Sequence, residues 1–279
     1  MSKSTRREVA LEKELAAVEK KELRLRRAAE AKQEPSRFEE LSGKIPPKVA
    51  EGLEAAFAKA LEMLLKKGSS LIEKTYNKEE LQQDQAVRDY AVHLKGSRKE
   101  LKKVRKAAKS SNLQNMAVTT LEGVGLGALG IGMPDIVLFT GFLLRGAYEA
   151  ALNYGFDYGS AGEKLWILKA VQTALLNDEE WLESDAMLDR MGETALTNVT
   201  EEMLAVQIKE TAQTLALGML MLKFVQGLPI VGIVGGLGNP VYYKKVMDYV
   251  QLKYHKRYLL GLYGKSKKTE KADGVSNSA

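Results

Sequence analysis

Two long stretches of this sequence are almost free of charge and rich in glycine, residues Met116–Leu144 and Thr211–Tyr243. A glycine weakens an isolated helix by up to about 1 kcal/mol relative to alanine, so helices of this composition need a reason in packing. Each stretch also places two glycines four positions apart, a spacing that lets two helix backbones approach closely. These pairs are Gly123 with Gly127 and Gly232 with Gly236. We therefore expect closely packed helical segments.

Neither stretch has the composition of one straight transmembrane helix, which needs about 20 predominantly apolar residues. Glu122 and Pro134–Asp135 divide the first stretch into shorter pieces, and seven glycines and prolines interrupt residues Phe224–Tyr243 of the second. We expect each stretch to form a broken helical hairpin, either buried in a core or dipping into one leaflet. Two spanning helices are the alternative, because basic residues flank both stretches on their outer sides.

Helical periodicity extends through the rest of the chain. Apolar residues recur at three- and four-residue spacing from Val49 to Leu65. Further helices are expected over residues 78–94, from 96 onwards, and over 136–151, 163–176, 203–224 and 241–262, with Thr200 as an N-cap. Arg145 and Glu149 are an i,i+4 pair on one helix face. We predict an all-α multi-helix bundle with two central Gly/Pro-interrupted apolar helical hairpins.

Composition divides the chain into three parts. Residues 1–46 are predicted to form a charged, largely solvated helix and a linker, because the apolar stripe from Val9 to Leu25 is thin. Residues 47–263 form the helical domain, and residues 264–279 a disordered basic tail. Residues Met1–Lys32 lack a secretory signal. We therefore expect a cytoplasmic protein, or one peripheral to the inner face of the cell membrane.

Residues that usually carry catalysis or metal binding are scarce. The chain has no cysteine, which excludes disulfides, thiol catalysis and cysteine-based metal sites. Its two histidines, His93 and His255, lack partners at ligand spacing. The segment Gly125–Gly130 matches the GxGxxG string of dinucleotide-binding folds, but no strand precedes it. We therefore expect no catalytic, cofactor-binding or metal-binding residues.

Basic residues crowd the outer flanks of the two stretches. Lys95–Lys109 carries eight of them against the single acid Glu100, and Lys244–Lys271 repeats the bias with tyrosines among the lysines. Such flanks attract an anionic membrane face, and tyrosine suits the headgroup level. The lack of aromatic residues in Lys95–Lys109 argues against nucleic acid, and a merely solvated face is the alternative. The predicted contact residues are Lys99, Lys102, Lys103, Lys106, Lys253, Lys256, Arg257 and Tyr258.

Four charged residues in apolar surroundings are candidates for a polar site in the bundle, namely Glu122, Asp135, Arg145 and Asp157. A buried charge is costly unless it is paired, so such residues have either a partner or a role in a site. The structural alternative is that they pair across helices, begin a helix, as Asp135 does after Pro134, or close a turn.

An ordered set of short motifs resembles the EcsC protein family over about residues 50–262. These motifs are Met133-Pro134-Asp135-Ile136, Tyr154-Gly155-Phe156-Asp157, the helix start at Glu163, Pro229-Ile-Val-Gly232, Asn239 and Lys256-Arg257-Tyr258-Leu259. The N-terminal helix lies outside this range. The resemblance implies a bacterial, all-helical protein without an established activity, whose family namesake is encoded beside an ABC-type transporter. It implies no catalytic residues.

These observations favour a non-enzymatic protein that associates with the cytoplasmic membrane face or with a membrane-protein partner. The alternative is a soluble, hydrolase-like helical enzyme, with a polar site in which Asp135, Asp157 or Glu122 meets a second polar group. The expected partners are an anionic membrane surface or a membrane protein, without a cofactor. The sequence leaves the oligomeric state open.

Overall fold

The computed structural model describes residues 3–31, 45–66, 69–115, 134–194, 196–225 and 240–276. Every regular element within these ranges is an α-helix, which confirms the predicted all-α fold. The glycine-rich segments 116–133 and 226–239, including Glu122, lie outside the described residues, so the two central hairpins stay a prediction.

The helices follow one another along the chain with short connections in most places. They are α1 (Lys3–Glu30), α3 (Pro47–Lys66), α4 (Ser69–Glu73), α5 (Lys78–Lys95), α6 (Arg98–Asn115), α7 (Pro134–Asn153), α8 (Ala161–Thr173), α9 (Asp178–Glu193), α10 (Glu201–Val225) and α11 (Pro240–Ser276). Among the described helices, not one has the length and apolar character needed to cross a bilayer.

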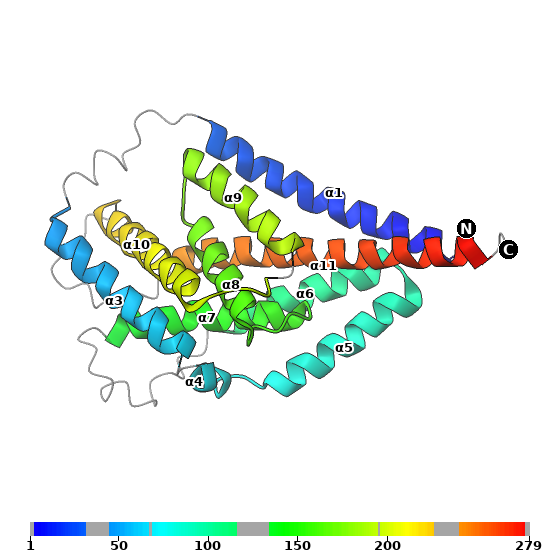
Figure 1. The fold of residues 1–279 in the computed structure, drawn as a ribbon, viewed down its shortest axis with the longest axis horizontal. Coiled ribbons are helices and arrows are strands. Elements are labelled where there is room, and N and C mark those ends of the chain that lie inside the picture. The colour runs from blue at the N-terminus through cyan, green and yellow to red at the C-terminus, as the bar shows by residue number, and fades with distance from the viewer. Residues whose placement is uncertain are drawn as a thin grey trace.

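The longest helix, α11, forms the axis of the molecule (Figure 1). It contacts α1, α6, α7, α8 and α9. Because neighbours surround it, its buried residues occupy several faces rather than one stripe, and they include Val246, Val250, Tyr254 and Leu259. The helix α1 lies antiparallel to α11, so that the first turn of α1 and the last turn of α11 are at the same end of the molecule (Figure 1).

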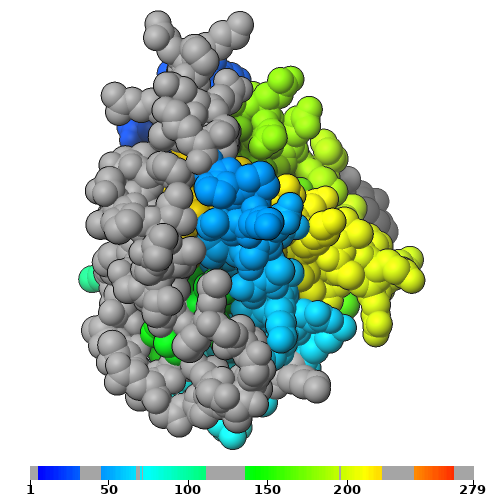
Figure 2. Space-filling model, turned by 90° about the vertical axis from the view of Figure 1, so that its left-hand side faces the viewer, coloured from blue at the N-terminus to red at the C-terminus, as the bar shows by residue number. Residues whose placement is uncertain are grey.

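At the opposite end, α3 packs against α10 (Figure 2). The helix α7 lies against α3, and the ring of Phe57 on α3 meets Phe139 on α7 edge to face, with 6.4 Å between centroids. Phe139 also lies 5.8 Å from the ring of Tyr242 on α11. These aromatic contacts join three helices into one apolar core.

Local sequence signals account for many helix boundaries. The side chain of Asn77 accepts a hydrogen bond of 3.1 Å from the backbone N–H of Glu80 and begins α5. Ser160 caps α8 in the same way. The predicted N-cap Thr200 is confirmed, because its hydroxyl accepts a bond of 3.2 Å from the N–H of Met203. These caps fix the residues at which α5, α8 and α10 begin.

The N-terminal helix is not the solvated helix predicted from its composition. Leu11 and Glu14 on α1 are completely buried, and α1 packs against α6, α9 and α11. The prediction was wrong because it counted apolar residues only. The carboxylate of Glu14 accepts hydrogen bonds from Arg98 at 2.6 Å and from Arg105 at 3.0 Å, so a charged residue supplies part of this interface.

The C-terminal tail also differs from the prediction. Helix α11 continues through Gly264 to Ser276 instead of ending near Leu262. A single glycine costs a helix about 1 kcal/mol relative to alanine and does not by itself end it. The segment after Gly264 contains no proline and has lysine, glutamate and alanine among its residues, so the helical hydrogen bonds continue.

Candidate functional site

A cleft of about 2450 Å³ lies among α1, α6, α8, α9, α10 and α11, and we call it the α1–α11 cleft. Much of its surface is apolar and comes from Leu175, Trp181, Leu217, Met221 and Leu252. Side chains of this kind reach one space only because the helices on which they lie converge along α11. The cleft is therefore a product of the tertiary packing rather than of any single motif.

One side of the α1–α11 cleft carries a concentration of positive charge. Its residues, which we call the basic wall, are Lys21 and Arg24 on α1, Lys102, Lys106 and Lys109 on α6, and Lys245 on α11. The buried residues Leu101, Val104 and Ala108 hold the opposite face of α6 in the core, so its lysines turn outwards. Within the described ranges, no carboxylate forms an ion pair with a residue of the basic wall.

Two residues of the basic wall, Lys21 and Lys245, have a lowered pKa. Burial lowers the pKa of Lys21, and the positive charges of Arg105 and Lys109 lower it further, against the weaker opposing effect of Asp248. Lys245 is accessible from the cleft, yet enough protein surrounds it that desolvation lowers its pKa. An anion in this part of the cleft would relieve both effects.

Two polar atoms at the cleft wall are buried without a hydrogen-bond partner in the described part of the chain, Nε2 of His255 and the hydroxyl of Tyr242. His255 is only 3% exposed, and burial together with the charges of Arg105 and Lys21 lowers its pKa to about 3. The imidazole is therefore neutral at neutral pH. Because buried polar atoms are normally hydrogen-bonded, both groups are unusual.

The cleft lining also includes acidic residues. The first turn of α9 contributes Asp178, Glu179 and Glu180, and Glu183 follows one turn later. Acidic residues in a first turn are stabilised by the positive end of the helix dipole, which gives them a structural role. The cleft lining thus carries positive charge on α1 and α6 and negative charge at the start of α9.

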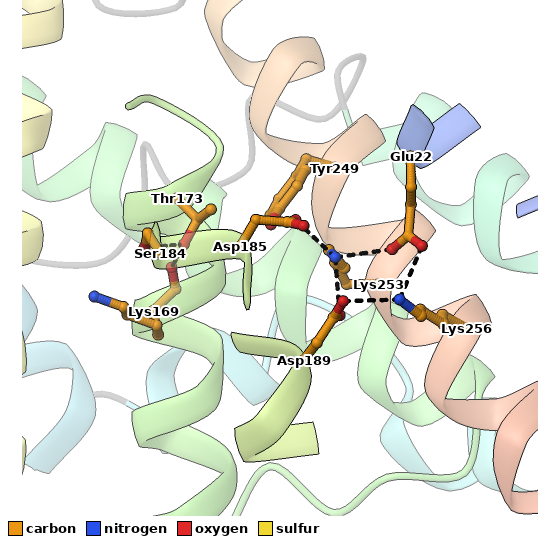
Figure 3. Close-up of polar contacts among 9 residues, drawn as sticks. All are labelled: Glu22, Lys169, Thr173, Ser184, Asp185, Asp189, Tyr249, Lys253 and Lys256. Carbon is orange, nitrogen blue, oxygen red and sulfur yellow. Dashed lines mark hydrogen bonds and ion pairs between the residues drawn. The ribbon is translucent and has the colours of Figure 1, made fainter. Parts of the chain in front are cut away.

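Behind the cleft, a buried ion cluster joins three helices (Figure 3). Nζ of Lys253 on α11 lies 2.8 Å from Glu22 on α1 and 2.8 Å from Asp189 on α9. It also lies 2.6 Å from Asp185, which accepts a hydrogen bond from the hydroxyl of Tyr249. Burial alone would lower the pKa of Lys253, but the three carboxylates outweigh it and raise that pKa.

This cluster corrects the prediction that the basic C-terminal run faces a membrane. Lys253 is 1% exposed, and Lys256 bridges Glu22 and Asp189 at 2.8 Å each. The predicted contact residues Arg257 and Tyr258 are also committed to internal partners. Arg257 donates two hydrogen bonds to Glu163, at 2.7 Å and 3.0 Å, and the Tyr258 hydroxyl donates to Asp89 at 2.8 Å. Since α11 is the axis of the fold, these four side chains point at other helices rather than at solvent.

The four lysines predicted on α6 are all exposed, and we call Lys99, Lys102, Lys103 and Lys106 the α6 lysine face. Among these, Lys103 pairs with Glu100 at 3.0 Å. The structure brings this face next to Lys21 and Arg24 of α1, which the sequence reasoning missed. The basic run in the second half of α1 was a visible signal, but treating α1 as a solvated helix concealed it.

The four polar residues in apolar surroundings do not converge on one site within the described residues. Arg145 and Glu149 form the predicted i,i+4 pair at 2.8 Å, and both are buried. Asp157 faces solvent and closes a turn, because its carboxylate accepts a bond of 2.9 Å from the N–H of Gly159. Glu122 and the side chain of Asp135 lie outside the described residues.

A metal site within the described ranges would need several histidine, aspartate or glutamate side chains that converge on one point. No group of three histidine, aspartate or glutamate side chains in those ranges has an arrangement that could hold a metal ion. The three carboxylates around Lys253 are instead occupied by two ammonium groups.

Comparisons with known proteins give one positive result. Neither the curated proteins nor the solved structures include a match to this chain. The EcsC protein family matches residues 10–259, so the family region begins within α1 rather than near residue 50 as predicted. Because this match extends over most of the chain, from the second turn of α1 to the middle of α11, the protein belongs to the EcsC protein family.

Proposed function

We propose that the protein associates peripherally with an anionic membrane surface through the α6 lysine face, at the cytoplasmic side of the membrane. The observation that supports this most is the exposure of all four lysines on a helix whose only acid is Glu100. The positive residues Lys21 and Arg24 of α1 adjoin them. A positively charged surface of this kind is complementary to acidic headgroups.

The expected strength of this contact is modest. Each basic residue close to an anionic surface contributes about 1 kcal/mol, and this attraction falls off within a Debye length of about 10 Å at 0.1 M salt. Four lysines would then contribute about 4 kcal/mol, which corresponds to a millimolar dissociation constant. The lysine face alone therefore gives weak, salt-sensitive binding.

Vesicle flotation of the full chain tests the proposal. The protein should float with vesicles that contain phosphatidylglycerol at low salt, and it should stay behind with pure phosphatidylcholine or at high salt. Replacing Lys99, Lys102, Lys103 and Lys106 together by glutamine should abolish flotation.

A matched control removes the same charge elsewhere. Lys48, Lys59, Lys74 and Lys209 are exposed and lie away from the α6 lysine face, so their replacement by glutamine should leave flotation unchanged. Equal losses in the two variants, or flotation that is indifferent to lipid charge, would contradict the proposal. Salt-resistant binding to native membranes without vesicle binding would instead indicate a membrane-protein partner.

A further inference from the structure

We propose that the α1–α11 cleft binds a single phospholipid with an acidic headgroup, whose phosphate lies at the basic wall and whose acyl chains lie on the apolar side chains of the cleft. This inference deepens the membrane association proposed above and rests on it. It supplies the apolar contribution that the α6 lysine face lacks.

The first argument is the size and lining of the cleft. Pockets for ordinary small molecules measure roughly 300–1,000 Å³, whereas this cleft measures about 2450 Å³. Its apolar part includes Trp181, Leu217, Met221 and Leu252, which come from three different helices. A free phosphate or a short polar metabolite would leave this apolar surface in water, whereas acyl chains would cover it.

The second argument is the charge of the basic wall. Lys21 and Lys109 repel each other there, and neither forms an ion pair with a described carboxylate. A phosphate between them accepts charge-assisted hydrogen bonds and removes this repulsion. The acidic residues in the first turn of α9 also line the cleft and repel a phosphate, so the headgroup is favoured near Lys21 and Lys109 rather than near α9.

The third argument is the pair of buried polar atoms without partners. His255 lies at the cleft wall, where the positive charges of Lys21 and Arg105 both act on it. Its Nε2 atom has no described hydrogen-bond partner. This nitrogen is buried in the structure, so it can donate to a headgroup oxygen only after side chains of the cleft wall have shifted. The hydroxyl of Tyr242 is likewise buried, against Gly218 of α10, and can reach an ester carbonyl only after the same kind of shift.

An amphipathic helix of a partner protein is the competing occupant of such a groove. It would place apolar side chains on the same surface, but it would need an acidic residue at one fixed position to pair with both Lys21 and Lys109. The charge of the basic wall therefore favours a lipid.

The test uses the full chain, freed of lipid, and dioctanoyl phosphatidylglycerol below the concentration at which it forms micelles. Trp181 lines the cleft, whereas the other tryptophan of the chain, Trp166, is buried outside it. Bromine on the acyl chains should quench the fluorescence of Trp181 with a saturable 1:1 stoichiometry, and Trp181→Phe should remove most of this quenching. Native mass spectrometry gives the stoichiometry independently.

Variants of the basic wall test the headgroup position. The double variant Lys21→Gln/Lys109→Gln should weaken phosphatidylglycerol binding at least tenfold, because it removes both cations that hold the phosphate. His255→Phe keeps an aromatic ring at a buried position and should weaken binding several-fold. The variant with Lys48, Lys59, Lys74 and Lys209 replaced by glutamine is the control that should bind normally, and circular dichroism confirms that each variant is folded.

Several results would overturn the cleft site. They are equal binding of dioctanoyl phosphatidylcholine, competition by glycerol 3-phosphate at the same concentration as the lipid, or the absence of saturable binding by the monomeric lipid. Vesicle flotation, measured in parallel, separates the two proposals. Flotation without binding of monomeric lipid rejects the lipid site in the α1–α11 cleft and leaves the α6 lysine face as the membrane contact. The cleft would then bind a protein helix or have no occupant. Binding of monomeric lipid without flotation supports the cleft and rejects the surface contact.

Discussion

Nζ of Lys253 on α11 lies 2.8 Å from a carboxylate oxygen of Glu22 on α1, although the two residues are 231 positions apart in the chain. This ion pair belongs to a buried cluster in which two lysines face three carboxylates from two helices. Burying charge is costly, so such a cluster is maintained only while every member keeps its partners. It ties α1, α9 and α11 together.

Replacing Lys253 by methionine should strongly destabilise the protein. The variant leaves Glu22 and Asp189 with Lys256 alone and Asp185 with only the Tyr249 hydroxyl. Breaking a buried pair from one side typically costs about 3–5 kcal/mol. The free energy of unfolding in urea measures this loss. Lys244→Met on the same helix is the control, because its pair with Asp248 is exposed and should contribute less than about 0.5 kcal/mol. Equal effects of the two variants would refute the role of the cluster.

Glu14→Gln should loosen α1 from the rest of the molecule. Glu14 is fully buried and accepts from both Arg98 and Arg105, whose side chains are partly exposed, so we expect a loss of about 1–3 kcal/mol. The rate of hydrogen exchange should rise for the backbone amides of α1 more than for those of α7 or α8. Glu12→Gln changes an exposed residue of the same helix and should leave exchange unaltered. Uniformly faster exchange across the protein would contradict a local role.

His255 should make the protein less stable in mild acid. Its pKa is lowered to about 3 from an ordinary value of 6.5. Between these two pH values the unfolded chain therefore binds a proton at His255 that the folded state does not bind. Stability therefore falls as pH decreases through this window, by up to about 1.4 kcal/mol for each pH unit from this group. Carboxylates titrate in the same range, so the readout is the difference from His255→Phe, whose stability should depend less steeply on pH. Parallel curves for the two proteins would show that His255 contributes nothing.

Arg257→Lys should destabilise the protein by about 2 kcal/mol despite keeping the charge. The guanidinium makes a two-bond contact with Glu163 and lies between the rings of Phe156, at 4.2 Å, and Trp166, at 4.3 Å. An ammonium group cannot make both parallel bonds or stack between two rings. Thermal unfolding followed by tryptophan fluorescence measures the loss. The exposed residue Arg190 offers a control, since Arg190→Lys should change stability by less than about 0.5 kcal/mol.

Two glycine-to-alanine substitutions should act in opposite directions. A methyl group at Gly162 would lie 2.3 Å from the backbone oxygen of Leu196, so Gly162→Ala should cost about 1–3 kcal/mol. At Gly261, within α11, no atom lies within 4 Å of the added methyl group, and Gly261→Ala should add about 0.5–1 kcal/mol through helix propensity. Thermal denaturation under one set of conditions compares both with the wild type. A stabilising effect at Gly162 would mean that the contact with Leu196 can relax.

Several elements of the fold were predictable from local sequence. The helix α5 spans Lys78–Lys95 against a prediction of 78–94, and α7 begins at Pro134, where the chain was expected to restart its helix. The Arg145–Glu149 pair was also predicted correctly. Each of these features depends on residues within one or two turns of each other, which is the range over which periodicity, capping and i,i+4 contacts act.

The candidate site was less predictable. The lysines of α6 were identified from their spacing, but Lys21, His255 and Tyr242 reach the same cleft from distant parts of the chain. Nothing within a few residues of His255 distinguishes a surface histidine from a buried one without a partner. Its neighbours Arg105 and Lys21 belong to other helices, so only the packed structure reveals its environment.

The sequence by itself determined that the chain is all-helical and where most helices begin, because helix formation depends on periodicity, caps and breakers within a few residues. It also determined that positive charge is concentrated on particular helices. Only the tertiary structure decided what that charge does. Lys99 and Lys253 both occur in basic runs, yet one faces solvent and the other is enclosed by three carboxylates from α1 and α9. The difference arises because burial and ion pairing depend on which helices become neighbours, and that is set by the packing of the whole chain.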